Sequence, residues 1–309
     1  VTGNTFTGLG AATWLLKKNK RLAVIIVCPY QHLVEQWVED IERFGFRPVI
    51  AFSSSPQKKW KERLKDEVID FNLEIEDTIC LVTTNATYTS KYVQEQIGKI
   101  EGDILIVVDE AHNFGAMRLS RYLRDDIKYR LALSATLERH GDEEGTQALY
   151  SYFGNKCIEY DLKRAIDEDK LTKYYYHPII VSLSDDELEK YRELSAKISK
   201  ACKYNEDGKA ELSEAAKTLL IQRSRIVAGA IEKIAVLKEL MKDYVNDNQI
   251  LVYCGATKPY NPALDESESD DEGERQIVMI SKMLGLELGM AVRHFTSNES
   301  AKEREEIKV

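Results

Sequence analysis

The stretch Ile104-Leu105-Ile106-Val107-Val108-Asp109-Glu110-Ala111-His112 puts two adjacent carboxylates directly after an uninterrupted aliphatic run. A run this apolar is typical of a strand that helices cover on both faces, as in a parallel sheet. Because neighbouring side chains of a strand point in opposite directions, Asp109 and Glu110 can face one ligand only where the strand ends and the chain turns. The stretch therefore predicts a buried strand that ends in an acidic site.

Four more apolar runs lie within the first 160 residues. They alternate with longer segments whose apolar residues recur three or four positions apart, which is typical of amphipathic helices. This alternation predicts the α/β class, with parallel strands joined by crossover helices. The expected strands are 22–28, 48–52, 79–83, 104–109 and 130–134, and the expected helices are 9–16, 33–44 and 60–71.

The length of 309 residues predicts more than one domain. After residue 160 the sequence becomes charged and helix-rich, with a capping-box pattern from Ser184 to Glu187 and a long helical stretch over 212–245. Strand-like runs return at 249–254 and 290–295. We therefore expect a first domain over 1–160, a helical connecting region over 161–246, and the first part of a second α/β domain over 247–309.

Composition places the chain among ordinary globular proteins. Hydrophobic residues make up 43% and charged residues 31%, and no apolar run approaches the length of a membrane span, so we expect no membrane partner. The 5 cysteines are too far apart for a zinc knuckle or a redox pair, which favours a reducing compartment, taken as the cytoplasm.

The formal net charge of −9 would oppose a polyanionic partner. Seven of the acidic residues lie within 265–274, however, so that without this run the net charge is only −2. The acidic run has no apolar periodicity, and we interpret it as a solvated loop. A basic groove elsewhere on the chain is compatible with this charge distribution.

The ends of the predicted strands are the places to expect a ligand, because loops and helix N-termini converge outside the carboxyl ends of parallel strands. The polar segments Thr83-Thr84, Asp109-Glu110 and Ser134-Ala135-Thr136 lie there. A magnesium-dependent phosphate reaction uses one carboxylate to hold the hydrated metal ion and another to orient or deprotonate the attacking water. The alternative interpretation of Asp109 and Glu110 is a pair of solvated surface acids.

The segments Asp109-Glu110-Ala111-His112, Ser134-Ala135-Thr136 and Val27-Cys28-Pro29-Tyr30 resemble motifs II, III and Ia of superfamily 2 helicases and translocases. Later segments are similar to motif IV and to the stretch before motif V of the same proteins, at 250–254 and at 293–297 with 303–306. Together with 223–230, these segments resemble the DEAH-box, ResIII-like proteins grouped with restriction and phage-defence helicases.

The resemblance implies a RecA-like P-loop sheet, a helical connection and the start of a second RecA-like domain. It implies ATP and Mg²⁺, with Glu110 as the catalytic base, Asp109 and Thr5 as metal ligands, and Gly3 and Thr5 at the nucleotide phosphates. It further implies that His112, Ser134 and Thr136 couple the nucleotide site to nucleic acid, which Pro29, Tyr30, Thr83 and Thr84 would contact along its backbone.

The implied partners are nucleic acid, DNA rather than RNA, and further subunits of a restriction or defence complex. For phosphate contacts we favour Arg223 and Arg225, which lie in the segment most similar to restriction-type helicases. The lysines around Trp60 are interpreted as a solvated helix face, because Trp60 belongs to an apolar stripe. Tyr30 and the Thr83-Thr84 pair also have a purely structural interpretation, as a helix cap and as ordinary strand-end residues.

Two features depart from the family pattern. A phosphate-binding loop reads G-x-x-x-x-G-K-[ST], whereas the chain starts Val1-Thr2-Gly3-Asn4-Thr5, so the second glycine and the lysine are not found. Either residues are omitted next to Gly3, or Asn4 replaces the lysine and ATP turnover is impaired. The sequence also ends at Val309, before the expected motifs V and VI, and we expect the second domain to be incomplete.

The function predicted from these features is an ATP-dependent helicase or translocase that acts on nucleic acid and hydrolyses ATP with magnesium. Within the same class, the alternative is a double-strand DNA translocase that does not separate strands. From a different class, the alternative is a catalytically impaired nucleic-acid-binding scaffold, favoured if Asn4 replaces the lysine.

Overall fold

The computed structural model describes residues 3–139, 141–204, 210–255, 276–296, 299 and 301–308. The chain divides into two compact units, Val1–Tyr174 and Tyr175–Val309, and each is described by itself. The first unit extends beyond the expected boundary at residue 160, because helix α8 (Leu162–Asp167) belongs to it rather than to the connecting region.

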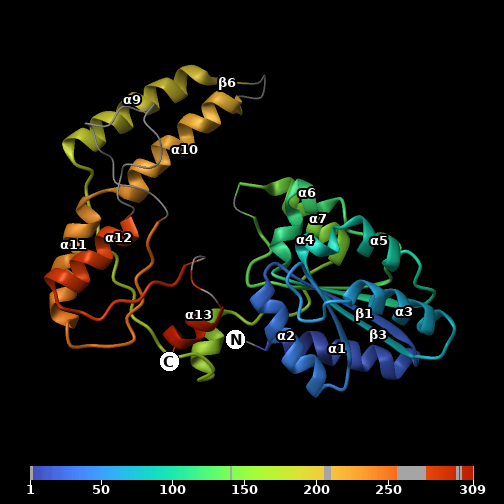
Figure 1. Cartoon of the computed structure of the whole chain (residues 1–309). Coiled ribbons are helices and arrows are strands. Elements are labelled where there is room, and N and C mark those ends of the chain that lie inside the picture. The colour runs from blue at the N-terminus through green and yellow to red at the C-terminus, as the bar shows by residue number, and fades with distance from the viewer. Residues whose placement is uncertain are drawn as a thin grey trace. The chain divides into compact units, whose positions relative to one another are not determined.

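The first unit is built on a five-stranded parallel sheet (Figure 1). The strands lie in the order β2-β3-β1-β4-β5, and every neighbouring pair is parallel. Each of the five expected strands is present, with ends shifted by no more than one residue. Their bounds are β1 (Leu22–Cys28), β2 (Pro48–Ala51), β3 (Thr78–Thr84), β4 (Ile104–Asp109) and β5 (Tyr129–Leu133).

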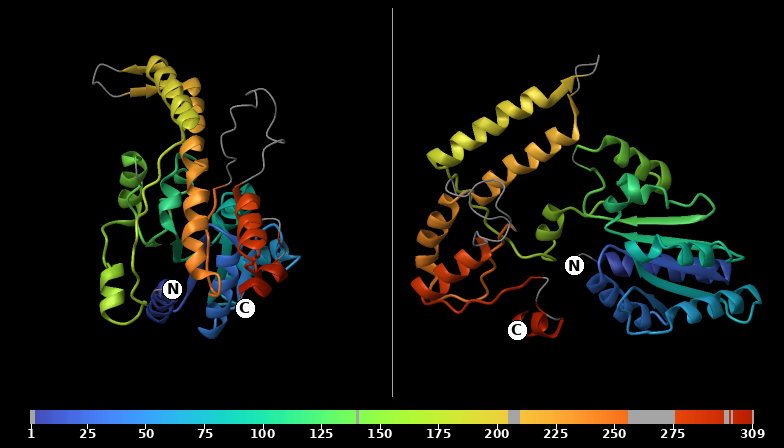
Figure 2. Two further views of the ribbon diagram at one scale, coloured as in Figure 1. Left: turned by 90° about the vertical axis from the view of Figure 1, so that its left-hand side faces the viewer. Right: turned by 45° about the horizontal axis from the view of Figure 1, so that its top comes forward.

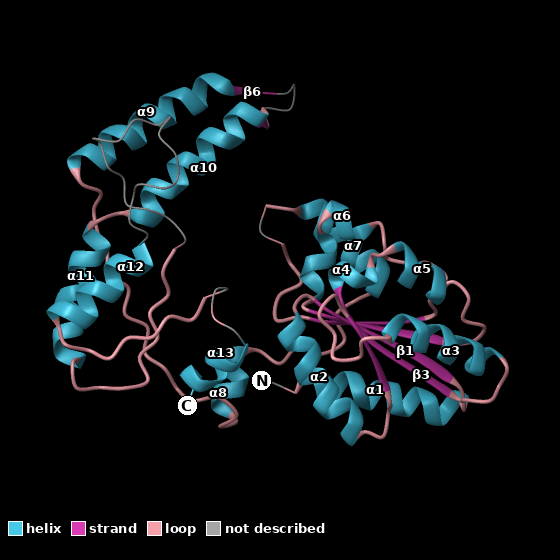
Figure 3. Cartoon of the chain, viewed as in Figure 1, coloured by secondary structure: helices cyan, strands magenta, loops and turns pink. Residues whose placement is uncertain are grey.

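Helices cover both faces of this sheet, and the two-residue period of the strands decides which side chains meet which helices (Figures 2 and 3). On β1, Val24 and Ile26 pack with α1 (Asn4–Asn19) and α2 (Gln31–Arg43), whereas Ile25 and Val27 pack with the other layer. That other layer comprises α3 (Trp60–Asn72), α4 (Asn85–Tyr88), α5 (Lys91–Ile97), η1 (Ala111–Gly115) and α7 (Glu143–Phe153), and α6 (Met117–Ser120) follows η1. The prediction of an α/β fold with a parallel sheet covered by helices on both faces is confirmed.

Gly8 lies where α1 approaches the sheet most closely. A Cβ atom at Gly8 would lie 2.7 Å from Cη2 of Trp37 on α2 and 3.2 Å from Cγ1 of Val107 on β4. Real Cβ atoms do not approach other atoms so closely, and Trp37 is itself 1% exposed and has no room to move. The absence of a side chain at this position therefore lets α1, α2 and β4 pack together.

The second unit contains a helical hairpin. Helix α9 (Asp185–Ala201) is followed by the short antiparallel pair β6 (Cys202–Tyr204) and β7 (Ala210–Leu212), and then by α10 (Glu214–Gly229). The predicted capping box at the start of α9 is confirmed: Ser184 and Glu187 each accept a backbone N–H from the other. Glu187 is 2% exposed and also accepts from the N–H of Ile231, so it ties the start of α9 to the end of α10.

A smaller cluster holds the later part of this unit. Met241, Ile280, Met283 and Leu284 pack together and join α11 (Glu232–Met241) to α12 (Gln276–Lys282) and to the π-helical turn η3 (Met283–Glu287). The remaining elements are η2 (Lys242–Tyr244) and α13 (Ala301–Lys308). Among the described helices, none has both the length and the apolar character needed to cross a bilayer.

The strands expected at 249–254 and 290–295 do not form. Both segments are irregular, and Val252, Cys254, Met290 and Val292 instead pack against the apolar cluster of α11 and α12. Apolar residues in a short run satisfy burial in either conformation, and only a hydrogen-bonded neighbour makes such a run a strand. The acidic run 265–274 and Ser297 lie outside the described residues.

We predict that Gly8→Ala destabilises the first unit although alanine favours helices. The added methyl group must displace the Trp37 ring, which should lower the free energy of unfolding by about 1–3 kcal/mol. Gly10→Ala is the matched control, because its Cβ meets nothing within 4 Å. That variant should be neutral, or more stable by up to about 1 kcal/mol. Urea denaturation followed by circular dichroism measures both, and equal stability of the two variants would contradict the packing argument.

Candidate active site

The carboxyl ends of four neighbouring strands meet at one edge of the sheet. In the strand register, Cys28 lies beside Thr84, Val27 beside Val108, and Asp109 beside Leu133. The segments that follow these strands therefore start next to one another, although they are far apart in the sequence. The structure thus brings together the three segments that resemble motifs Ia, II and III.

The carboxylate of Asp109 is buried and is held by two hydrogen bonds. Asp109 is the last residue of β4 and is 8% exposed. It lies two positions after Val107, and therefore on the sheet face that α1 and α2 cover. Trp37 Nε1 donates to Oδ2 at 2.9 Å, and the Glu110 backbone N–H donates to Oδ1 at 3.0 Å. The orientation of this carboxylate is therefore fixed from two sides.

The role of Trp37 does not follow from its sequence pattern. The apolar stripe of α2 predicts a core residue, and Trp37 is one, but its indole N–H also faces the acidic strand end. The chemistry of the side chain is the one sequence feature that points to this role. A buried indole N–H needs a hydrogen-bond acceptor, and the carboxylate at an acidic strand end can supply it.

Cys28 ends β1 on the same face as Asp109. Burial, and then the negative charge of Asp109, raise the pKa of the Cys28 thiol well above its usual range. The thiol is therefore neutral at physiological pH. It contributes no second negative charge beside Asp109 and no thiolate nucleophile.

Glu110 adopts a left-handed backbone conformation, with φ 47° and ψ 50°. This region is uncommon for a residue other than glycine and costs on the order of 1–2 kcal/mol. Asn113 stabilises the turn, because its backbone N–H and its side-chain amide both donate to the Glu110 carbonyl, at 3.0 and 2.9 Å. The expected turn at the strand end is confirmed. It separates a buried carboxylate on Asp109 from a half-exposed one on Glu110.

His112 connects the carboxylate of Glu110 to the end of β5. Its Nδ1 lies 3.3 Å from Glu110 Oε2 and 3.1 Å from Ser134 Oγ. Ser134 Oγ donates to the Thr136 carbonyl at 2.7 Å, so it accepts from the histidine. The side-chain amide of Asn113 faces Nε2 at 3.4 Å, which suits an unprotonated Nε2. This network assigns the neutral histidine proton to Nδ1 and links motif II to motif III.

Arg139 supports this network from the loop after Ser134-Ala135-Thr136. Its guanidinium donates to the His112 carbonyl and to Asp142 Oδ2. These bonds bring its side chain so close to Gly115 that a Cβ there would lie 2.3 Å from the Arg139 Cδ. The hydrogen bond from Arg139, and then one from the Gly145 N–H, lower the pKa of Asp142. No sequence signal in the motifs points to Arg139.

The start of α1 fits part of a phosphate-binding loop. Gly3 precedes the helix with φ 80°, and its carbonyl accepts from the N–H of Thr7 at 2.9 Å. The order Gly3-Asn4-Thr5 is similar to the G-K-[ST] end of such a loop, with Asn4 at the position of the lysine.

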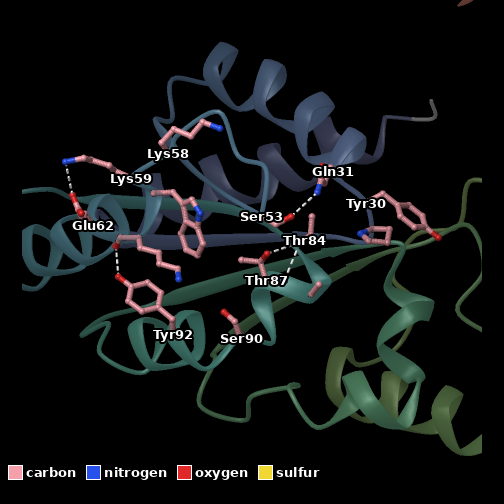
Figure 4. A pocket seen from close by; sticks show the side chains of 14 residues that line it. Tyr30, Gln31, Ser53, Lys58, Lys59, Glu62, Thr84, Thr87, Ser90 and Tyr92 are labelled. Carbon is pink, nitrogen blue, oxygen red and sulfur yellow. Dashed lines mark hydrogen bonds and ion pairs between the residues drawn. The ribbon is translucent and has the colours of Figure 1, made fainter. Parts of the chain in front are cut away.

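A cavity of about 830 Å³ opens beside this edge of the sheet (Figure 4). Pro29, Tyr30 and Thr84, for which the resemblance implies contacts to nucleic acid, line it. Thr84 also begins α4, where its hydroxyl accepts from the Thr87 N–H. Tyr30 is 61% exposed and stacks on His32, with ring centroids 5.6 Å apart.

The opposite wall of the cavity is basic and aromatic. Lys58, Lys59, Trp60, Lys61 and Tyr92 line it, and the three lysines are exposed (Figure 4). The ammonium of Lys61 lies 5.7 Å from the Trp60 ring and 5.6 Å from the Tyr92 ring, and the Tyr92 hydroxyl donates to the Lys61 carbonyl at 2.5 Å. All three lysines are exposed, as interpreted, but only Lys61 lies on α3, whereas Lys58 and Lys59 precede the helix. All three line the same cavity as Thr84.

Three other predicted contacts lie elsewhere. Thr83 is fully buried, and its hydroxyl donates to the Ala51 carbonyl at 2.7 Å, so it joins β3 to β2 and does not line the cavity. Arg223 and Arg225 belong to α10 in the second unit. Arg223 donates to Ser195 Oγ and lies over the Tyr191 ring, whereas Arg225 is exposed. Residues two apart on a helix face different directions, so these arginines do not form one patch.

The family match agrees with this geometry. Residues 2–139 match the family model described as type III restriction enzyme, res subunit. The match covers α1, all five strands of the sheet and the Ser134-Ala135-Thr136 triplet. This match is to the kind of protein that the motif segments resemble, and it confirms the resemblance to ResIII-like proteins for this part of the chain.

Two solved structures are similar to the chain. The helicase domain of Hef from Pyrococcus furiosus is 23% identical, with a TM-score of 0.40 over 64% of this chain and 41% of that one. A nuclease-deletion mutant of the type ISP restriction-modification enzyme LlaGI, in complex with a DNA substrate mimic, is 16% identical. Its TM-score is 0.42 over 80% of this chain and 25% of that one. The chain spans less than half of either structure, and no curated protein matches it.

We predict that the lysines of the cavity contribute to nucleic-acid binding, and that Arg223 and Arg225 contribute less. Each phosphate contact to a single strand adds about 0.7 to the slope of log K against log salt. Replacing Lys58, Lys59 and Lys61 by glutamine should therefore reduce the slope by about 2. The measurement is the fluorescence anisotropy of a labelled single-stranded oligonucleotide over a range of salt concentrations.

The matched control for this prediction is Lys65→Gln. Lys65 lies one turn after Lys61 on α3 and is exposed, but it does not line the cavity. It should leave the slope unchanged, whereas Lys61→Gln should lower it. A triple variant that keeps the wild-type slope, or a larger loss in Arg223→Ala/Arg225→Ala, would assign the phosphate contacts to the second unit instead.

Proposed function

We propose that the chain is the motor part of an ATP-dependent helicase or translocase that acts on nucleic acid, DNA rather than RNA. One observation carries the proposal: the carboxylate of Glu110, next to that of Asp109, connects through His112 to Ser134, at the sheet edge where the lysine-lined cavity also opens. An acidic site for nucleotide chemistry and a basic surface for a polyanion therefore share one rigid edge. The ResIII family match supports the same function.

The residues at the strand ends fit a magnesium ion. Magnesium prefers oxygen ligands, and it is usually held by one or two carboxylates together with water and substrate phosphates rather than by a complete protein cage. Asp109 supplies such a carboxylate, and Thr5 at the start of α1 supplies a hydroxyl. Among the residues that the structure describes, no cluster of three or more His, Cys, Asp or Glu side chains could hold a metal ion by itself.

The fit to the phosphates of ATP is incomplete. The left-handed Gly3 and the N–H groups of the first turn of α1, which have no helical partners, suit bound phosphate oxygens. Asn4 supplies a neutral amide where the family has a lysine ammonium, and so leaves part of the negative charge of the phosphates uncompensated. We therefore expect nucleotide binding that depends strongly on magnesium, and slower turnover than a lysine would support.

The roles of this chain's residues follow from their environments. Bound Mg²⁺ would supply charge neutralisation for the phosphates. Asp109 is buried and oriented, as a metal-holding group must be, whereas Glu110 is half-exposed and can accept a proton from water. His112 lies between Glu110 and Ser134, so a change in the position of Glu110 reaches the loop after β5 directly. Glu110 is therefore proposed as the catalytic base, with Ser134 and Thr136 in the coupling path.

A second function, a nucleic-acid-binding scaffold without turnover, is favoured by Asn4. The two functions differ in one measurement, ATP hydrolysis with and without DNA or RNA. Within the first function, strand-displacement assays distinguish a helicase from a double-strand translocase, for which triplex displacement is the readout. We further propose a cytoplasmic location and association with other subunits of a restriction or defence complex.

We predict that Glu110→Gln abolishes multiple turnover and leaves nucleotide binding largely intact. Glutamine keeps the shape of the side chain but cannot accept a proton, and loss of a general base typically costs 10²–10⁴-fold in rate. Asp109→Asn should instead weaken the magnesium-dependent part of nucleotide binding. Phosphate release and equilibrium binding of a fluorescent ADP analogue measure the two effects. Wild-type turnover in Glu110→Gln would remove this residue from the role of base.

We also predict that Asn4→Lys increases both nucleotide affinity and ATP turnover, by about 10-fold or more. A lysine at this position adds a charge-assisted contact to the phosphates, which is worth about 1.5–3 kcal/mol. Lys→Gln at an exposed position of the same helix, Lys18→Gln, controls for a change in charge alone. If Asn4→Lys leaves turnover at zero in the presence of nucleic acid, the scaffold function is the correct one.

A further inference from the structure

The side chain of Trp37 contacts three elements of the first unit. It belongs to α2, its Nε1 donates to Asp109 at the end of β4, and its ring packs against α1 at Gly8. It is 1% exposed. A phenylalanine or a leucine could fill this apolar position equally well, but neither can donate a hydrogen bond. Packing alone therefore does not account for the bond from the indole N–H to the Asp109 carboxylate.

The hydrogen bond determines how the Asp109 carboxylate can face a metal ion. One oxygen accepts from the backbone of Glu110, which moves only with the strand end. The other accepts from Trp37, which moves with α2. The plane of the carboxylate, and thus the direction of its remaining lone pairs, is therefore set jointly by β4 and α2.

Helix α2 starts at the cavity. Tyr30 precedes the first turn, Gln31 is the first helical residue, and both line the cavity (Figure 4). Gln31 also bonds to Ser53 and Ser54 on the loop after β2. Trp37 follows six positions after Gln31, which is about 9 Å along a rigid helix. An occupant that shifts the start of α2 therefore also shifts the indole that holds Asp109.

We propose that Trp37 is a positioning residue, which orients Asp109 for magnesium and couples this orientation to the occupancy of the cavity by nucleic acid. The inference rests on the proposed function for the role of Asp109 and adds the path between the two sites. Such coupling is reciprocal. If a bound oligonucleotide changes the affinity of the protein for magnesium-nucleotide, bound magnesium-nucleotide changes the affinity for the oligonucleotide by the same factor.

The first experiment measures binding rather than turnover. A fluorescent ADP analogue is titrated at several Mg²⁺ concentrations and in EDTA, with and without a single-stranded oligonucleotide. Trp37→Phe should weaken the magnesium-dependent part of the affinity by about 3–10-fold and leave the affinity in EDTA unchanged. The oligonucleotide should change the affinity of the wild-type protein for the magnesium-bound ADP analogue by about 5-fold or more. In Trp37→Phe, the oligonucleotide should change this affinity by no more than about twofold. In an Asp109→Asn background, Trp37→Phe should have no further effect on the magnesium dependence.

A variant that keeps the ring size separates the hydrogen bond from packing. In a Trp14→Phe/Trp60→Phe background, residue-specific incorporation of benzothienylalanine replaces the indole N–H of Trp37 by sulfur. Compared with the same background that carries tryptophan at position 37, this protein should show the magnesium-dependent binding defect of Trp37→Phe, and its melting temperature should differ by no more than a few degrees. It also tests the inference if Trp37→Phe fails to fold.

The second experiment observes the hydrogen bond without any nucleotide. In ¹⁵N-tryptophan-labelled protein, the indole resonance of Trp37 is assigned with Trp37→Phe. It should move on Asp109→Asn and on addition of the oligonucleotide. The resonance of Trp14 serves as the internal reference, whereas Trp60, which lines the cavity, should respond to the oligonucleotide.

The outcomes separate the two levels of inference. If the wild-type protein binds no magnesium-nucleotide, the proposed function fails. Independently of that result, an indole resonance of Trp37 that does not shift in Asp109→Asn would overturn the positioning role. If wild-type binding depends on magnesium but the Trp37→Phe and benzothienylalanine proteins behave like wild type, Trp37 is a packing residue only. A wild-type affinity that does not respond to the oligonucleotide overturns the coupling.

Discussion

The register of β1 with β3 and β4 is the constraint on which the site depends. These strands are buried on both faces, so each residue along them is committed to one layer of helices or the other. A slip of one residue would turn Asp109 away from α1 and α2 and move its indole donor out of reach. Because the strands are parallel, the same register also gathers at one edge the segments that carry the chemistry.

At that edge the chain keeps two adjacent carboxylates in different environments. The left-handed backbone of Glu110 breaks the alternation of the strand, so that Asp109 stays under α2 while Glu110 faces His112 and solvent. The strain of this turn is local, and the bonds from Asn113 offset part of it. Under the proposed function, this difference in burial and in hydrogen-bond donors is what lets one carboxylate hold a metal ion and the other accept a proton.

The net charge of the whole chain does not predict the charge of the cavity beside Thr84. The net charge is −9, but the cavity beside Thr84 is lined by three exposed lysines, with Glu62 as an acidic neighbour that pairs with Lys59 at 3.5 Å. An exposed pair of this kind contributes little, and at physiological salt the field of distant acids is screened within about 8 Å. Attraction for a polyanion depends on the charges that line the cavity.

The sequence alone determined the five strands of the parallel sheet, the helices α2 and α3 and the capping box of α9, because these depend on local periodicity and on short-range hydrogen bonds. Tertiary structure alone decided that Trp37 binds Asp109, that Thr83 is used within the sheet, and that the lysines around Trp60 share a cavity with Thr84. It also decided that 249–254 and 290–295 are not strands. In each of these cases the interacting residue lies far away in the sequence. The local sequence pattern indicates which face of a helix or strand a side chain occupies, but not which distant residues it contacts there.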